Sequence, residues 1–206
     1  MTLSVLLPLL AGWALAVISP GPATMAILGA ALGQGRATAL AVTAGVCTGA
    51  LFWGSMAALG MGAAMASHAW ALEVLRYAGA AYLLWLAIGA ARRAASADAA
   101  SVKGGRTLTL RRAWAKGAAI HLTNPKAVFF WGSVFAVALP TGAGRGDILT
   151  LLAACAGVSV TMLTAYALIF STPRAMAFYA RARRWFDAGF AALFGAAGIG
   201  ILLARV

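Results

Sequence analysis

The chain has 206 residues, of which 63% are hydrophobic and only 10% are charged, and its mean hydropathy is +0.91. A soluble domain carries about 25% charged residues, so this composition excludes an ordinary water-soluble protein and indicates that lipid surrounds most of the chain. The formal net charge of +12 suggests nucleic-acid binding, but no soluble domain remains to present a groove, and we expect no nucleic-acid partner.

Charged residues divide the chain into apolar stretches, each long enough for the roughly 20 residues that a membrane-spanning helix needs. We expect an all-α membrane protein with six transmembrane helices, near residues 3–32, 38–63, 70–91, 112–138, 147–171 and 185–204. A cleaved signal peptide begins with a basic region, and the first basic residue here is Arg36. The first apolar stretch is therefore expected to be a span.

The first span contains the sequence Ser19-Pro20-Gly21-Pro22. The two prolines remove backbone donors and the glycine between them loosens the chain, so the sequence predicts a broken helix. Carbonyls one turn earlier lose their partners, and each unpaired group costs several kcal/mol in hydrocarbon. Such backbone is tolerated where protein or a water-filled cavity satisfies it.

The fourth span is interrupted in the same way by Thr123-Asn124-Pro125-Lys126. The segment 94–110, rich in Ala, Ser and Gly, separates a first half, 1–93, from a second half, 111–206, and each half has three spans. Because three is odd, the second half enters the membrane from the opposite side. The sequence thus predicts two inverted three-helix repeats with broken first and fourth helices, and such matched breaks indicate a transport site.

Lys126 is expected at this site. It follows Arg112 by about 21 Å of helix, a depth at which a cation is costly and normally faces the bundle interior. The half-helices that begin at the breaks present free N–H groups and a positive dipole end, which suit a carboxylate. We expect these groups and Lys126 to hold a substrate carboxylate, while Asn124 and loose carbonyls near Ser19 hold its ammonium group.

Basic residues are distributed unequally between the connections. The three odd-numbered connections contain eleven Lys and Arg residues: Arg36, Arg92, Arg93, Lys103, Arg106, Arg111, Arg112, Arg174, Arg181, Arg183 and Arg184. The even-numbered ones contain only Arg145. The positive-inside rule therefore places the odd connections in the cytoplasm, in contact with anionic membrane lipids, and both termini in the periplasm.

The remaining ionisable residues offer little chemistry. No set of Asp, Glu, His and Cys resembles a metal site or a catalytic triad, so we expect no metal, no cofactor and no enzymatic activity. Cys47 and Cys155 lie in apolar spans and are expected to act as small buried residues. Asp187 is expected to pair with Arg183 or Arg184 on its own helix.

Four motifs carry a family resemblance: Pro20-Gly21-Pro22, then Gly45-Val46-Cys47-Thr48-Gly49, then Gly79-Ala80-Ala81-Tyr82-Leu83, then Asn124-Pro125-Lys126-Ala127. In this order they resemble the signatures of LysE/RhtB amino-acid exporters, over nearly the whole chain. The resemblance implies export of amino acids or close derivatives across the bacterial inner membrane, driven by the proton motive force.

The resemblance also implies roles for single residues. Pro20, Gly21, Pro22, Asn124, Pro125 and Lys126 would line the substrate path. Gly45, Gly49 and Gly79 would let helices pack closely. Many members carry an acidic residue after the second glycine of the Gly45–Gly49 stretch, where this chain has Ala50, so no proton-carrying residue is evident.

Two other functions stay open from the sequence. One is a transmembrane thiol–disulfide electron carrier that uses Cys47 and Cys155. The other is a metal-ion exporter, which would need a cluster of ligands within the membrane. The small number of charges in the spans favours a small neutral amino acid over a dibasic one as the substrate. The sequence does not decide whether the chain forms a homo-oligomer.

Overall fold

The structure is a computed structural model that describes residues 3–67, 69–96, 108–139 and 143–203. All regular secondary structure in these residues is helical. The helices are α1 (Leu3–Ile18), α2 (Pro22–Gln34), α3 (Arg36–Ser67), α4 (Ala69–Ala95), α5 (Leu110–Leu122), α6 (Pro125–Ala138), α7 (Arg145–Phe170) and α8 (Pro173–Leu203).

The structure has a break in each of the two spans where the sequence predicts one. Between α1 and α2 the chain bends by 56°, and α2 restarts with Pro22 in its first turn. Between α5 and α6 the chain restarts at Pro125, preceded by Asn124 as the N-cap. Proline suits the first turn because its missing N–H would have no helical partner there.

Several of the helices are long and apolar enough to cross a membrane. Among the described residues, Arg36–Gly60 of α3 and the whole of α7 satisfy this on their own, and α1 with α2 adds a third if the bent pair is one span. Many large apolar side chains lie exposed on the outside of the bundle, which suits a lipid environment. The other spans of the six-span arrangement stay a prediction.

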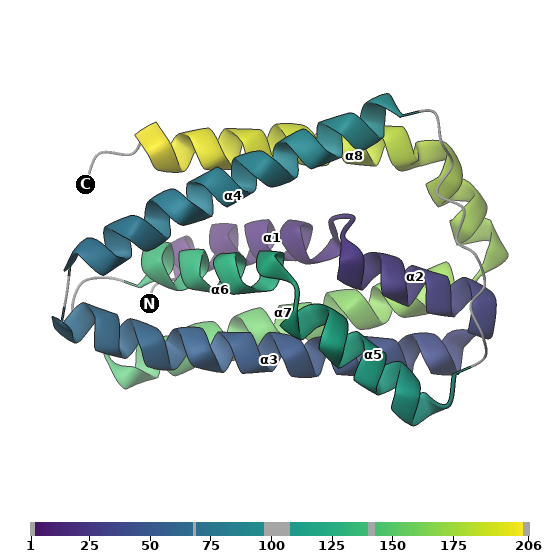
Figure 1. Ribbon diagram of the computed structural model, residues 1–206, viewed down its shortest axis with the longest axis horizontal. Helices are drawn as coiled ribbons and strands as arrows, with labels where there is room; N and C mark the ends of the chain where they lie inside the picture. Colours follow the sequence, from purple (N-terminus) through teal and green to yellow (C-terminus); the bar gives the residue numbers. More distant parts are fainter. Residues whose placement is uncertain (1–2, 68, 97–107, 140–142, 204–206) are drawn as a thin grey trace.

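Most helices run roughly along the long axis of the bundle, and matching helices of the two halves run in opposite directions (Figure 1). The α1–α2 pair runs opposite to the α5–α6 pair, α3 runs opposite to α7, and α4 runs opposite to α8. Helix α4 packs along α8, and α3 packs along both α5 and α7. Both breaks lie near the middle of the long axis.

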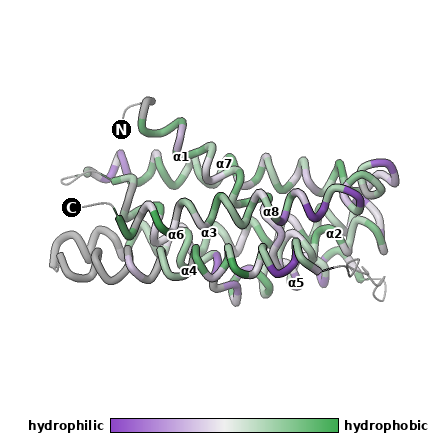
Figure 2. Tube along the Cα trace, turned by 90° about the horizontal axis from the view of Figure 1, so that it is seen from above, coloured by the Kyte–Doolittle hydropathy of each residue, from purple (hydrophilic) through white to green (hydrophobic). Residues whose placement is uncertain are grey.

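Most of the basic residues that the structure describes gather at one end of the bundle, whereas Arg145, which begins α7, lies at the other end. The end of α4 and the beginnings of α3, α5 and α8 all lie at the basic end, and Figure 2 shows hydrophilic residues concentrated toward it. Lys116, which falls inside the predicted fourth span, is exposed on α5 near this end. Lys103 and Arg106 lie outside the described residues.

A buried ion pair joins α4 to α8. Asp187 is 1% exposed, and one of its carboxylate oxygens accepts from Arg93 Nε at 3.1 Å. This differs from the expected pairing within α8, because Asp187 lies on the face of α8 that packs against α4. Arg183 and Arg184 instead donate to the carbonyls of Ser96 and Ala94, at 3.4 and 3.0 Å. Basic residues in the first half of α8 thus hydrogen-bond the carbonyls at the end of α4 and directly after it.

Glycines bring α3 and α5 into backbone contact. A Cβ built on Gly45 would lie 2.0 Å from the carbonyl oxygen of Trp114, and one on Gly117 would lie 2.1 Å from that of Val42. A Cβ on Gly49 would lie 2.9 Å from the Cβ of His121. Any larger residue would force the two helices apart. Gly79 lies in α4, but its packing is outside what the structure describes.

Candidate functional site

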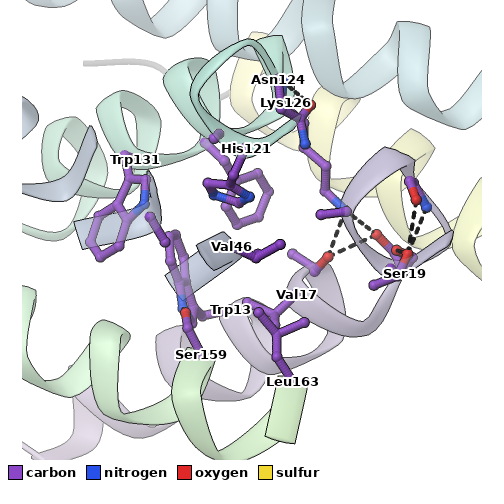
Figure 3. Close-up of a pocket in the computed structure, with 17 residues that line it drawn as sticks. Trp13, Val17, Ser19, Val46, His121, Asn124, Lys126, Trp131, Ser159 and Leu163 are labelled. Atoms are coloured by element: carbon purple, nitrogen blue, oxygen red, sulfur yellow. Dashed lines mark hydrogen bonds between the residues drawn. The ribbon is translucent and has the colours of Figure 1, made fainter. Parts of the chain in front are cut away.

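A cavity of about 60 Å³ lies beside both helix breaks, and it is roomy enough for a few water molecules. Its walls come from α1, the first break, α2, α3, α5, α6 and α7. Members of all three hydrophobic core clusters line it, so it lies where these clusters meet. The residues labelled in Figure 3 are Trp13, Val17, Ser19, Val46, His121, Asn124, Lys126, Trp131, Ser159 and Leu163.

Lys126 connects the two breaks. It lies in the first turn of α6, and its ammonium group reaches across to the end of α1 (Figure 3). There Nζ donates to the carbonyl oxygen of Ala16 at 2.7 Å and to the hydroxyl oxygen of Ser19. The ring of Phe194 lies 5.8 Å from Nζ, within range of a cation–π contact. The cation that the sequence predicts at the second break is therefore bound at the first.

The backbone of the first break is satisfied mainly by its own hydroxyl groups. Ser19 is 1% exposed, and its Oγ donates to the carbonyl oxygen of Ala16 at 2.7 Å. Thr24 Oγ1 donates to the carbonyl oxygen of Ser19 at 3.2 Å and accepts from the N–H of Gly21 at 2.9 Å. The carbonyls of Ala16 and Ser19 at the break are thus paired within the protein, as the apolar surroundings require.

Some of the predicted site residues line the cavity, and others shape the backbone at the two breaks. Ser19, Gly21, Asn124 and Lys126 line the cavity. Pro20 and Pro22 are not among its lining residues; they shape the backbone at the first break, as Pro125 does at the start of α6. A Cβ built on Gly21 would lie 4.0 Å from Lys126 Nζ, so the cation passes close to the backbone there.

The polar groups expected to hold a substrate ammonium group are already engaged in this state. Asn124 is 5% exposed, and its side-chain oxygen accepts from the backbone N–H of Lys126 at 3.0 Å. The carbonyl of Ala16 and the hydroxyl of Ser19 carry the ammonium group of Lys126. The protein's own cation therefore occupies the position expected for the substrate's.

The sequence reasoning missed most of the other lining residues, among them Trp13, Trp131, Ser159 and His121. The rings of Trp13 and Trp131 meet edge to face with centroids 4.5 Å apart, and Trp13 Nε1 donates to Ser159 Oγ at 2.9 Å. The ring nitrogen Nδ1 of His121 is buried without a hydrogen-bond partner. A weak signal existed for Trp13 and His121, because Trp13 lies two turns before one break and His121 one turn before the other.

The cysteines lie in different parts of the core. Cys155 is completely buried in the cluster that contains Trp13 and Trp131, and its backbone carbonyl accepts from Trp13 Nε1 at 2.9 Å. Cys47 packs against the cluster that contains Val42 and Val46. Both thiols are free. Within the described part of the chain, no group of three His, Cys, Asp or Glu residues could hold a metal ion.

The family model named "LysE type translocator" matches residues 14–205, which include both breaks and every lining residue except Trp13. The chain belongs to the LysE-type translocator family. The resemblance carried by the four sequence motifs is therefore confirmed. LysE-type translocators are membrane transporters, and the expectation of no enzymatic activity agrees with this membership.

Several curated relatives of this chain are efflux proteins. The chain is 27% identical to the threonine efflux protein of Escherichia coli K12, over 92% of this chain and 93% of the relative. It is 28% identical to the homoserine/homoserine lactone efflux protein of Salmonella typhimurium, over 73% and 72% of the two chains. No solved structure matches the chain. Neither relative supports the thiol–disulfide or metal-ion alternative.

Proposed function

We propose that this protein exports small neutral amino acids from the bacterial cytoplasm across the inner membrane, driven by the proton motive force. Membership of the LysE-type translocators and similarity to threonine and homoserine efflux proteins support amino-acid export. The observation that carries the proposal is the reach of Lys126 from the second break to the first. A single cation between two broken helices is suited to bind a zwitterion near the middle of the membrane.

The contacts of Lys126 suggest how a substrate enters. In the state seen, the lysine ammonium binds the carbonyl of Ala16 and the hydroxyl of Ser19. An amino acid carries an ammonium group of its own, which can donate hydrogen bonds to the same two oxygen atoms. Lys126 is then released to bind the substrate carboxylate, together with the N–H groups that begin α2 and α6. Without substrate, the ammonium group of Lys126 pairs with this carbonyl and this hydroxyl. Substrate binding replaces it there with the ammonium group of the amino acid.

The site would be assembled from two inverted repeats, 1–93 and 111–206, joined by the linker 94–110. The packing supports this arrangement: α1 and α2 contact α7 as α5 and α6 contact α3, while α4 contacts α8 and α3 contacts α7. The correspondence is incomplete, because α2 also packs on α3 and α4 on α6. Rocking of one repeat against the other about the breaks would open the site to each side in turn.

The inverted arrangement predicts a definite topology. Reporter fusions at Ser96 and Arg181 should read cytoplasmic, and fusions at Ser67 and at the carboxyl terminus should read periplasmic. The reason is the concentration of basic residues at the end of the bundle where α4 ends and α8 begins. Alkaline phosphatase and green fluorescent protein fusions, which are active on opposite sides, provide the measurement. A cytoplasmic carboxyl terminus would contradict both the six-span arrangement and the inverted repeat.

The function itself is tested by export from loaded cells. Cells that overproduce the protein and are fed dipeptides should release threonine or homoserine several times faster than cells with an empty vector. Lysine release should not change, because the cavity walls that the structure describes offer no carboxylate to a second cation. Amino acids in the medium are measured by chromatography. Equal release of every neutral amino acid with and without the protein would reject the proposal.

A further inference from the structure

One buried polar atom at the cavity has no partner. Within the residues that the structure describes, His121 Nδ1 is the single buried side-chain nitrogen or oxygen without a hydrogen bond. An orphaned polar atom in apolar surroundings costs about 1–3 kcal/mol, so such an atom in a native protein calls for a partner outside the chain. His121 lines the same cavity as Lys126 and points into it from α5 (Figure 3).

Several other polar groups of the cavity are engaged. Ser19 and Lys126 bond to each other, and the side-chain oxygen of Asn124 caps α6. The hydroxyl of Ser159 accepts from Trp13 and donates to the carbonyl oxygen of Cys155. His121 Nδ1 is thus a place where a polar atom of a ligand gains a hydrogen bond without displacing one inside the protein.

The position of His121 is fixed by the helix behind it. A Cβ on Gly49 of α3 would lie only 2.9 Å from the Cβ of His121, so the absence of a side chain at Gly49 lets α5 present the imidazole to the cavity. The close packing of α3 and α5 holds the backbone of His121 in place, and a polar group on a fixed backbone can select between ligands, because less conformational entropy is lost on binding.

From this geometry we infer that His121 is a specificity-determining residue that hydrogen-bonds the side-chain hydroxyl of a hydroxy amino acid. A hydroxyl is both a donor and an acceptor, so it can satisfy Nδ1 in either neutral tautomer of the ring. The inference rests on the proposed function, in which Lys126 and the first break hold the carboxylate and the ammonium group. The hydroxyl is then the remaining polar group of the substrate, and His121 Nδ1 is an unpaired atom of the cavity that can bind it.

The physical consequence is discrimination against shape analogues. Valine has nearly the shape of threonine but a methyl group in place of the hydroxyl. A methyl group against His121 would leave Nδ1 unpaired, and a site built to pair a hydroxyl rejects ligands that lack it. We expect the protein to favour threonine over valine by about tenfold or more, which corresponds to the loss of one buried hydrogen bond.

The test uses the full-length protein in proteoliposomes, with counterflow of labelled threonine and with unlabelled threonine or valine as competitor. His121→Leu should lower the threonine-over-valine preference about tenfold, because it removes the polar atom and keeps an apolar wall. His121→Asn, whose side-chain oxygen can replace Nδ1 as an acceptor, should keep part of the preference. The amount of folded protein is compared by size-exclusion chromatography in detergent.

The possible failures are distinguishable. If the unmodified protein shows no threonine counterflow, the proposed function fails for this substrate, and the inference fails with it. If threonine counterflow is normal but His121→Leu keeps the wild-type preference, the inference alone is overturned. If both variants are folded but lose threonine and valine transport equally, His121 does not read the hydroxyl, and the inference is again overturned.

Discussion

Replacing Lys126 with alanine is expected to reduce export to nearly the level of cells that lack the protein. In the proposed mechanism the lysine ammonium is the group that receives the substrate carboxylate. A hydrogen bond to a charged group contributes about 1.5–3 kcal/mol, so its loss should lower transport by about tenfold to a hundredfold or more. Export of threonine from dipeptide-loaded cells measures the effect.

The same variant should insert and accumulate normally. The carbonyl oxygen of Ala16 loses its bond to Lys126 but keeps the hydroxyl of Ser19 at 2.7 Å and the backbone N–H of Ser19 at 3.3 Å. The break therefore stays satisfied without the lysine. Lys116→Ala on the exposed surface of α5 is the matched control, since it removes the same side chain from a position outside the cavity. Its export should equal that of the unmodified protein.

Lys126→Arg separates the charge of the lysine from its shape. The guanidinium group keeps the positive charge, but its planar fork is larger than an ammonium and cannot fit the same two partners beside Gly21. Export by this variant should stay well below the unmodified level. Normal export by Lys126→Ala would show that the lysine is not part of the site.

The breaks and the lysine could be predicted from the sequence because their causes are local. Proline removes a backbone donor wherever it stands in a helix, but Pro8 lies inside α1 without ending it. Pro22 and Pro125 mark breaks because Gly21 and Asn124, which suit a helix start, directly precede them. The order of the motifs then identified the family, and the match over residues 14–205 confirms it. Features that follow from local backbone chemistry could thus be predicted from the sequence alone.

The partners across helices could not be predicted, because they depend on which helix faces meet. Asp187 was expected to pair within α8, and it pairs instead with Arg93 of α4. Trp13 and His121 carried only the weak signal of their spacing from the breaks, which does not distinguish a cavity residue from an ordinary core residue. Lys116 was placed inside a span, although α5 presents it on the exposed surface near the basic end of the bundle. Each of these depends on helix packing rather than on local sequence.

The second large effect is expected at Gly45, where replacement with alanine should nearly abolish accumulation of folded protein. The added Cβ would lie 2.0 Å from the carbonyl oxygen of Trp114 and 2.7 Å from the backbone nitrogen of Ala118. Both are backbone atoms, which cannot rotate away as a flexible side chain can, so α3 and α5 must separate. Overpacking typically costs about 1–3 kcal/mol, and a contact between backbones should lie at or above the upper end of this range.

Gly157→Ala provides the matched comparison, because it makes the same substitution in another long apolar helix. A Cβ on Gly157 meets nothing within 4 Å, so no helix has to move. Alanine also favours the helical state over glycine by about 1 kcal/mol, and the variant should be as stable as the unmodified protein or slightly more stable. Membrane abundance and the thermal midpoint in detergent should therefore change in opposite directions for the two variants. Equal thermal midpoints for the two variants would show that α3 and α5 do not approach each other closely at Gly45. The same interface positions His121 through Gly49, so this result would also contradict the position of His121 beside the cavity.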